Sequence, residues 1–231
     1  MLEKIEIIRF IFSIAAMLVL PIIIIGALIF ILRGFVIAGK ERSEAFRKFA
    51  QEAGFSYSGS HEISAIKGAE YFRLFNLGSG YGRQIENSVD GIINNFQASI
   101  FDYTFYVTFS FKKIRRQTVV LIHSSRLNLP LFSIQPKSKW ILSNSGNNLI
   151  ERMGLSDKTF SDKYLIIGQD LQHIKHIFNH QVISYFKTTE DFVVEGGGNR
   201  ILLYRDGMMA SPNQFPGMIQ EGVKIAQLFA N

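Results

Sequence analysis

Cysteine is absent from this chain of 231 residues, so no disulfide bond stabilises its fold. The absence of thiols does not decide the compartment. The sequence also lacks an Asn-x-Ser/Thr glycosylation site, an internal repeat and a long low-complexity tract. It contains neither a Gly-Lys-Ser/Thr phosphate-binding motif nor a Gly-x-Ser-x-Gly element around a nucleophilic serine. These absences leave a globular domain of ordinary composition and one exceptional segment.

The exceptional segment is Phe10–Leu32, which contains no charged residue. As a helix it would be about 34 Å long, which is enough to cross a hydrocarbon core of roughly 30 Å. A cleaved signal peptide has a shorter apolar stretch, and Ile37-Ala38-Gly39 is a poor cleavage site. A core helix of a small domain is rarely apolar on every face. We therefore expect an uncleaved signal anchor in residues 1–39 and a soluble domain in residues 40–231.

The basic residues beside this span indicate its orientation. Lys4 and Arg9 precede it, whereas a larger group follows it: Arg33, Lys40, Arg42, Arg47 and Lys48. Because basic flanks stay on the cytoplasmic side, we expect the C-terminal domain to be cytoplasmic. The expected location is the bacterial inner membrane, crossed once.

The segment directly after the span, Ser43–Ala53, has the pattern of a short amphipathic helix. Its apolar positions, Phe46, Phe49 and Ala50 among them, follow helical spacing, and Gly54 suits the helix end. We expect a separate helix that packs on the domain.

The middle of the chain has the alternation of an antiparallel meander. The three expected strands lie at Gln84–Asn94, Phe96–Phe111 and Gln117–His123, and short turns are expected around Asn94-Asn95 and Lys113-Ile114. In the first, Ile85 and Val89 are expected on one face, with Ser88 and Asp90 opposite. The second has one aromatic and one more polar face, which predicts one buried side. The third is apolar on both faces, which is typical of a central strand.

The C-terminal third alternates strands and helices. The expected elements are strands at Leu131–Gln135, Tyr164–Ile167, Phe192–Glu195 and Arg200–Tyr204, and helices at Leu171–Phe186, interrupted near Asn179, and Gly217–Phe229. Gly196–Gly198 is interpreted as a hairpin tip and Ser143–Asn148 as a mobile loop. The predicted fold class is α+β, with one N-terminal transmembrane helix followed by an antiparallel sheet and helices packed on one side.

Four motifs could carry chemistry, but none has the context that its chemistry requires. Asp170, His173, His176 and His180 share one helical face, as zinc ligands can. The opposite face is apolar, so we interpret the histidines as solvent-exposed. Gly78–Gly82 precedes a strand rather than following one, which favours a turn over a phosphate-binding loop. Asp102 could act in catalysis, and so could a group in the next strand and loop: His123, Ser124 and Ser125. None of them lies in a recognisable catalytic motif, so the sequence predicts no catalytic, cofactor-binding or metal-binding residue.

Acidic residues are absent between Asp102 and Glu151, whereas this interval contains seven basic residues: Lys112, Lys113, Arg115, Arg116, Arg126, Lys137 and Lys139. The group Lys112, Lys113, Arg115 and Arg116 has the character of an exposed hairpin tip. It could be a solvated turn or a contact for anionic lipid or an acidic protein. Nucleic acid is not an expected partner.

Several segments together resemble a bacterial family of single-pass, membrane-anchored α+β proteins with no assigned activity. They are FDYTFYVTF, QTVVLI, LPLFSIQP, YLIIGQD and VVEGGGNRILLYRDG, and the resemblance covers most of residues 95 to 231. It implies the architecture and a bacterial origin, but no catalytic residue.

The leading functional hypothesis is a non-catalytic binding, scaffold or accessory subunit at the cytoplasmic face of the membrane, without a cofactor. Its expected partners are the lipid bilayer, another membrane protein or a second copy of the chain. The alternative is a membrane-tethered, hydrolase-like enzyme. An Asp102 that opens into a deep cleft beside a histidine or an arginine would favour the enzyme.

The orientation can be tested with reporters fused after Asn231. A reporter that is active only in the cytoplasm should work, because the basic flank follows the span. A reporter that requires export should be inactive in the same position. The opposite pair of results would reverse the predicted topology.

Overall fold

The computed structural model describes residues 2–66, 68–77, 82–107, 114–137, 151–153, 157–189 and 192–230. The chain forms two compact units, Met1–Glu44 and Ala45–Asn231. Residues 143–148, the expected mobile loop, and most of the glycine-rich segment 78–82 lie outside the described residues, as do Lys112 and Lys113.

Helix α1 spans Leu2–Ala53 and includes a region, Val19–Ala53, that is long and apolar enough to cross a membrane. Its most apolar 18-residue window has a mean hydropathy of 2.6, and none of that window is buried. The expected separate helix at Ser43–Ala53 is wrong, because these residues continue α1. The apolar positions of this end are nevertheless buried in the second unit, and Gly54 follows the helix with a φ of 68°.

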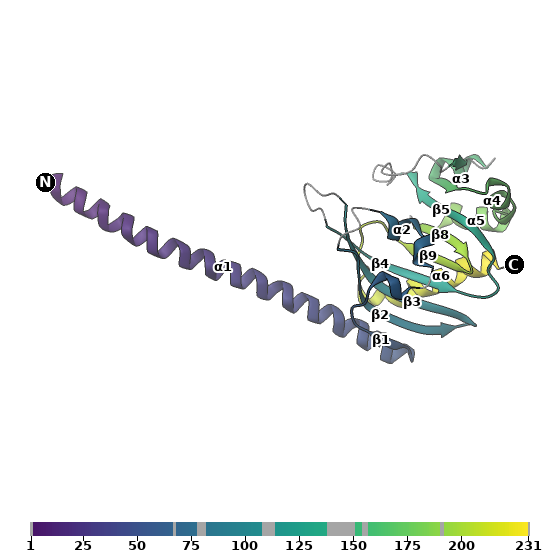
Figure 1. Ribbon diagram of the computed structural model, residues 1–231, viewed down its shortest axis with the longest axis horizontal. Helices are drawn as coiled ribbons and strands as arrows, with labels where there is room; N and C mark the ends of the chain where they lie inside the picture. Colours follow the sequence, from purple (N-terminus) through teal and green to yellow (C-terminus); the bar gives the residue numbers. More distant parts are fainter. Residues whose placement is uncertain are drawn as a thin grey trace. The chain divides into compact units, whose positions relative to one another are not determined.

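The second unit contains a nine-stranded sheet within the part of the chain that the structure describes (Figure 1). Its strands are β1 Ser56–Ser58, β2 Gln84–Ile93, β3 Phe96–Tyr106, β4 Ile114–His123, β5 Leu129–Pro136, β6 Glu151–Met153, β7 Tyr164–Gly168, β8 Val193–Gly198 and β9 Arg200–Tyr204. The spatial order is β1-β2-β3-β4-β9-β8-β5-β7-β6, and every neighbouring pair is antiparallel.

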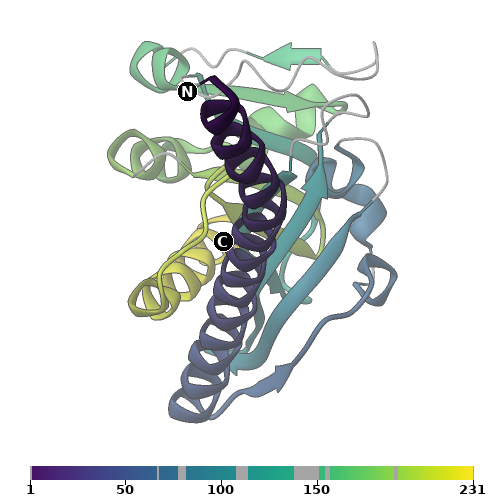
Figure 2. The ribbon, with the colours of Figure 1, turned by 90° about the vertical axis from the view of Figure 1, so that its left-hand side faces the viewer.

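Helices cover the first face of this sheet, and shorter turns cover part of the second face. The first face carries α3 Lys158–Lys163, α4 Leu171–Ile177, α5 His180–Thr188 and α6 Phe215–Phe229. The second face carries two 3-10 turns, η1 Ile63–Ala65 and η2 Ala69–Tyr71, and the short helix α2 Arg73–Asn76. Figure 2 shows the green and yellow helices on one side of the sheet and the blue segment on the other. This arrangement confirms the predicted α+β class.

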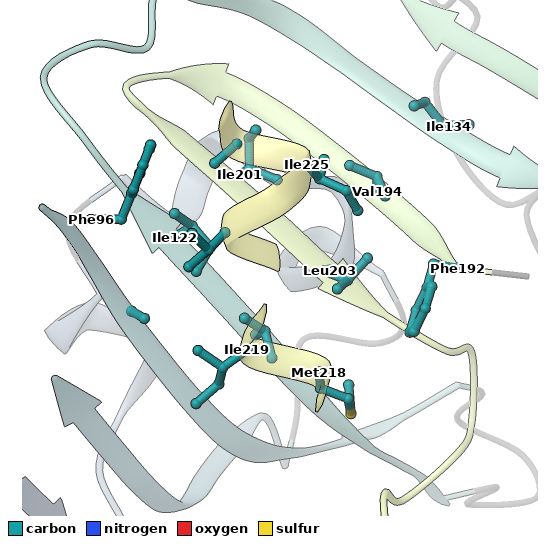
Figure 3. Close-up of a cluster of buried hydrophobic side chains, with 14 of the residues drawn as sticks. Phe96, Ile122, Ile134, Phe192, Val194, Ile201, Leu203, Met218, Ile219 and Ile225 are labelled. Atoms are coloured by element: carbon teal, nitrogen blue, oxygen red, sulfur yellow. The ribbon is translucent and has the colours of Figure 1, made fainter. Parts of the chain in front are cut away.

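The larger core lies between the sheet and α6. Figure 3 shows Ile122 of β4, Val194 of β8 and Leu203 of β9 gathered around Ile219 and its neighbours in α6. Gly222 lets the helix approach the sheet, because a Cβ atom there would lie 2.9 Å from a methyl group of Val120. The Phe215 ring packs 4.3 Å from the Phe46 ring.

The smaller core covers the aromatic face of β3. Phe101, Tyr103 and Phe105 are buried there, and the Phe75 ring of α2 lies 5.1 Å from the Tyr103 ring in an edge-on arrangement. The other face of β3 is also buried, since Ile100 lies in the larger core. The expectation that this strand has one buried side is therefore wrong.

Strand β2 contains a bulge that reverses the faces of its residues. The pairing with β3 shifts between Glu86 and Val89, and Asn87 adopts a φ of 53°. One extra residue in a strand moves every later side chain to the opposite face. Ile85 therefore lies in the smaller core and Val89 in the larger one, contrary to the expectation that they share a face.

Gly196 and Gly197 lie inside β8 and do not form the expected hairpin tip. Gly197 pairs with Arg200, so the loop consists of Gly198 and Asn199. A Cβ atom at Gly196 would lie 2.2 Å from the Phe132 ring of β5. The glycines therefore serve close packing between strands.

Two local predictions are confirmed. Asn94 and Asn95 both adopt positive φ values, 52° and 66°, in the tight turn between β2 and β3. The helix break falls at Asn179, whose side chain caps α5 by accepting hydrogen bonds from the backbone of Gln181 and Val182.

The tight contact at Gly196 predicts that Gly196→Ala destabilises the fold by about 1–3 kcal/mol, because the added methyl group overlaps the Phe132 ring. The matched control is Gly217→Ala in α6, where a Cβ atom meets nothing within 4 Å and helix propensity favours alanine. Denaturant unfolding of the full chain in detergent measures both. Equal stability of the two variants would contradict the packing role of Gly196.

Candidate functional site

Asp102 is a buried structural residue. Its side chain is 1% exposed and accepts a hydrogen bond from Thr118 Oγ1 at 2.9 Å. The Thr118 hydroxyl oxygen in turn accepts one from the backbone N–H of Ala210, also at 2.9 Å. Asp102 thus helps to attach the loop after β9 to the sheet. It opens into neither of the two cavities described below.

The break between α4 and α5 separates His180 from the other members of the helical motif, Asp170, His173 and His176. Asp170 caps α4 by accepting a hydrogen bond from the His173 backbone at 3.0 Å, while His180 begins α5. His176 and His180 are exposed. Among the described residues, no group of three or more histidine, cysteine, aspartate or glutamate side chains could hold a metal ion.

A cavity of about 810 Å³ lies on the second face of the sheet, on the part that includes the β2–β3 and β8–β9 hairpins. Three apolar side chains line it, Ile66, Phe101 and Leu121. The other lining residues are polar: Ser58, His61, Ser88, Asp90, Gln97, Ser99, His123, Asn199 and Arg200. We call this cavity the polar groove.

Strand register brings these polar side chains into one row. Asp90 of β2 pairs with Ser99 of β3. Gln97 of β3 pairs with His123 of β4, which pairs with Arg200 of β9. The row therefore crosses four adjacent strands, and the bulge in β2 puts Asp90 on the groove side.

The β2 end of the polar groove is acidic and rich in hydroxyl groups. The Ser99 hydroxyl donates to Asp90 Oδ1 at 2.5 Å, and the Ser88 hydroxyl donates to Oδ2 at 3.1 Å. Each carboxylate oxygen of Asp90 can accept further hydrogen bonds.

The β9 end of the polar groove is basic. His123 Nδ1 lies 2.9 Å from Gln97 Oε1, an oxygen acceptor that favours a proton on Nδ1 and leaves Nε2 as an acceptor. Burial lowers the pKa of His123, and the positive charge of Arg200 lowers it further. Arg200 is half-buried and lies against Gly68, where a Cβ atom would be 2.9 Å from its Nη1.

Ser88, Ser99 and His123 of the polar groove do not form a nucleophile and its base. Both serine hydroxyls described above donate to Asp90, and His123 pairs with Gln97. A catalytic serine instead needs a histidine within hydrogen-bonding reach. Ser124 is buried and caps the adjacent turn by accepting from the Arg126 backbone, and Ser125 is exposed.

Of the residues that line the polar groove, only His123 was a candidate site residue from the sequence. One signal was available. Gln97 and Ser99 occupy the same face of β3 as Phe101 and Tyr103, so the aromatic face begins with polar residues. Arg200 and Asn199 gave no such signal, because their relation to β3 depends on the pairing of β9 with β4.

A second cavity, of about 460 Å³, lies beside α5 and α6. Its charged groups have partners within the fold. The Tyr185 hydroxyl donates to Glu221, and Lys224 Nζ lies 4.7 Å from the centre of the Tyr185 ring. Arg205 lies 4.2 Å from the centre of the Phe192 ring. These internal contacts make this cavity a weaker candidate for ligand binding.

Two residues of the basic hairpin tip are described, Arg115 and Arg116, and they lie in strand β4, paired with β3, rather than in the expected turn. Arg115 lies 3.7 Å from Asp206 in an ion pair, and Arg116 is exposed. Nearby apolar side chains are also exposed: Ile114, Met208 and Met209. The Thr118 backbone N–H donates to the Met208 carbonyl and Arg115 pairs with Asp206, so the loop after β9 lies beside the first half of β4. Basic and apolar side chains therefore occur together at this end of β4.

Glu195 is fully buried between β9 and α2. Its Oε1 accepts a hydrogen bond from the Tyr204 hydroxyl at 2.8 Å, and its Oε2 accepts one from the Leu74 backbone at 3.1 Å. Burial raises the pKa of Glu195, and these hydrogen bonds offset only part of that effect. Glu195 attaches the segment that covers the second face of the sheet.

The chain thus combines one N-terminal apolar helix with an α+β unit built on an antiparallel sheet. No model of a known protein family matches it, and no curated protein matches it. Among solved structures, it is similar to the crystal structure of the mycobacterial trehalose monomycolate transport factor A, TtfA. The TM-score is 0.57 with 16% sequence identity, over 81% of this chain and 92% of that chain. This likeness shows a shared fold.

The raised pKa of Glu195 predicts a pH-dependent stability. The folded chain holds the Glu195 proton more tightly than the unfolded chain, so the free energy of unfolding falls as pH rises from about 4.5 through the raised pKa. Glu195→Gln should remove this contribution and flatten the curve of unfolding free energy against pH.

Denaturant unfolding over a pH series, on the full chain in detergent, measures this effect. Glu70→Gln is the control, because Glu70 is exposed on the neighbouring turn η2. If the curves of wild type and Glu195→Gln run parallel, Glu195 does not couple protonation to folding.

Proposed function

We propose that this chain is a single-pass membrane protein whose C-terminal domain is a non-catalytic accessory subunit of a membrane transport system. One observation carries the proposal. A helix long and apolar enough to span a membrane precedes a domain whose fold is shared with a transport factor. In this proposal residues 1–39 are the anchor, residues 40–231 form the domain, and the domain lies at the cytoplasmic face of a bacterial inner membrane.

The polar contacts described above support a non-catalytic role. The Asp102 carboxylate accepts a hydrogen bond from the Thr118 hydroxyl. The His123 ring is hydrogen-bonded to the side-chain amide oxygen of Gln97 rather than to a serine hydroxyl. The criterion that would favour a tethered enzyme, Asp102 in a deep cleft, is not met.

The basic hairpin tip is the proposed contact surface for an acidic partner, either a membrane protein or anionic lipid. It combines Lys112, Lys113, Arg115 and Arg116 with the exposed Ile114, Met208 and Met209. Arginine and methionine are enriched in protein interfaces, and each basic residue near an anionic bilayer contributes about 1 kcal/mol.

Affinity purification of the full chain in mild detergent, followed by mass spectrometry, tests the accessory role. We expect a membrane transport protein to co-purify with the wild type. The variant Lys112→Glu, Lys113→Glu, Arg116→Glu should lose it, because the reversed charges repel an acidic partner. This variant retains Arg115, which pairs with Asp206.

The matched control reverses three exposed basic residues elsewhere, Arg126, Lys158 and Lys175. It should retain the partner. Retention by both variants would exclude the hairpin tip as the contact, and hydrolytic turnover by the purified wild type would overturn the non-catalytic role. Co-sedimentation with anionic vesicles, performed on the domain that lacks its anchor, distinguishes contact with lipid from contact with a protein.

A further inference from the structure

The polar groove has two chemically different ends. At one end, Asp90 offers carboxylate oxygens beside two serine hydroxyls. At the other end, Arg200 offers guanidinium donors beside Asn199 and His123. Three strand spacings separate these ends, which is roughly 14 Å. A ligand that uses both ends must therefore have two different kinds of polar group.

From this arrangement we propose that the polar groove binds an anionic polyol, such as a phosphoglycerol group or a sugar phosphate. The anionic group binds at Arg200 and Asn199, and the hydroxyl groups extend along Ser99 toward Asp90. A phosphoglycerol group can belong to a lipid head group or to a free metabolite.

The charge of Arg200 supports the position of the anion. Arg200 is half-buried, and within the described part of the chain no carboxylate forms an ion pair with it. A guanidinium group that is partly removed from water gains most from a bidentate anion such as phosphate or carboxylate. Asp90 would repel an anion at the opposite end, so the two charges orient the ligand.

His123 can report the local field at this end of the groove, because it pairs with Arg200 across β4 and β9. Burial lowers the pKa of His123, and the positive charge of Arg200 lowers it further. An anion bound between the two residues would offset the Arg200 charge and would raise the pKa of His123. Its titration therefore reports occupancy of this end of the groove.

The remainder of the lining suits a polyol. A hydroxyl group both donates and accepts hydrogen bonds, and the Gln97 amide, the Ser99 hydroxyl and the Asp90 carboxylate together offer both functions. Phe101 and Leu121 of the smaller core provide apolar surface for carbon–hydrogen groups. A metal ion is not favoured, because the described residues contain no suitable cluster of ligands.

Isothermal titration calorimetry on the full chain tests the proposal, in a polyoxyethylene detergent that carries no sugar or phosphate group. The probes are glycerol 3-phosphate, inorganic phosphate and glycerol. The wild type should bind glycerol 3-phosphate most tightly. Arg200→Gln should weaken binding at least about tenfold, because the charge-assisted hydrogen bonds are lost. Arg126→Gln removes the same charge from an exposed turn outside the groove and should leave affinity unchanged.

Asp90→Asn distinguishes the two ends of the groove. It should weaken the binding of glycerol 3-phosphate severalfold and leave the binding of inorganic phosphate unchanged or stronger. In NMR spectra of the five histidines, assigned with His123→Asn, glycerol 3-phosphate should raise the pKa of His123 in the wild type. If Arg200→Gln does not fold, this pKa measurement on the wild type still tests whether the groove binds the anion.

The source of the anion is resolved in nanodiscs. A rise in the pKa of His123 with phosphatidylglycerol, relative to phosphatidylcholine alone, supports a lipid head group, and a rise only with soluble glycerol 3-phosphate supports a metabolite. The proposal is overturned if neither raises this pKa, if Arg200→Gln binds like Arg126→Gln, or if glycerol binds as tightly as its phosphate. Loss of a protein partner in the purification experiment has no bearing on these outcomes.

Discussion

The need to bury both faces of the central strands β3 and β4 governs the rest of this fold. Helix α6 satisfies it on one face, where its apolar stripe packs across the sheet. The other face carries Phe101, Tyr103 and Val119, and among the described residues the short segment from η1 to α2 covers it. That segment is too short to cover the whole face. The uncovered end is the place where β2, β3, β4 and β9 carry polar side chains, and the polar groove results.

The attachment of the covering segment depends on a buried carboxylate. A four-residue helix such as α2 has little stability of its own, since nucleation requires several fixed dihedral angles for each hydrogen bond gained. Glu195 satisfies a free N–H group at the start of α2, and Tyr204 satisfies the second carboxylate oxygen. Burial of a charge without such partners costs several kcal/mol. The same residue therefore fixes the aromatic side chains of α2 against β3 and makes stability sensitive to pH.

Local sequence patterns predicted most of the elements but not the faces that they present. The turn at Asn94–Asn95 and the helix break at Asn179 follow from local side-chain chemistry, so both were predictable. The bulge at Asn87 was not predictable, because an alternating pattern assigns every second residue to the same face and does not reveal where a strand contains one additional residue. Gly196 was misassigned because its neighbour Phe132 comes from a strand distant in sequence.

The candidate site was less predictable than the fold for the same physical reason. A groove lined by four strands depends on three registers at once, and each register is a long-range property of the sheet. Asp102 was considered as a candidate because it lies among aromatic residues. The chain uses it to attach a loop, and the accessible carboxylate is Asp90, which the bulge turns toward the groove.

The proposed binding site in the polar groove and the proposed contact surface at the basic hairpin tip lie at opposite ends of β4. The last residue of this strand, His123, lines the groove, and its first residue, Ile114, lies at the basic hairpin tip. Nine residue steps of an extended strand correspond to about 30 Å. This distance exceeds the screening length of roughly 8 Å at physiological ionic strength severalfold, so charges at one site have little influence on the other. Substitutions at Arg200 and at Arg116 therefore test the two proposed functions, small-ligand binding and contact with a membrane partner, separately from each other.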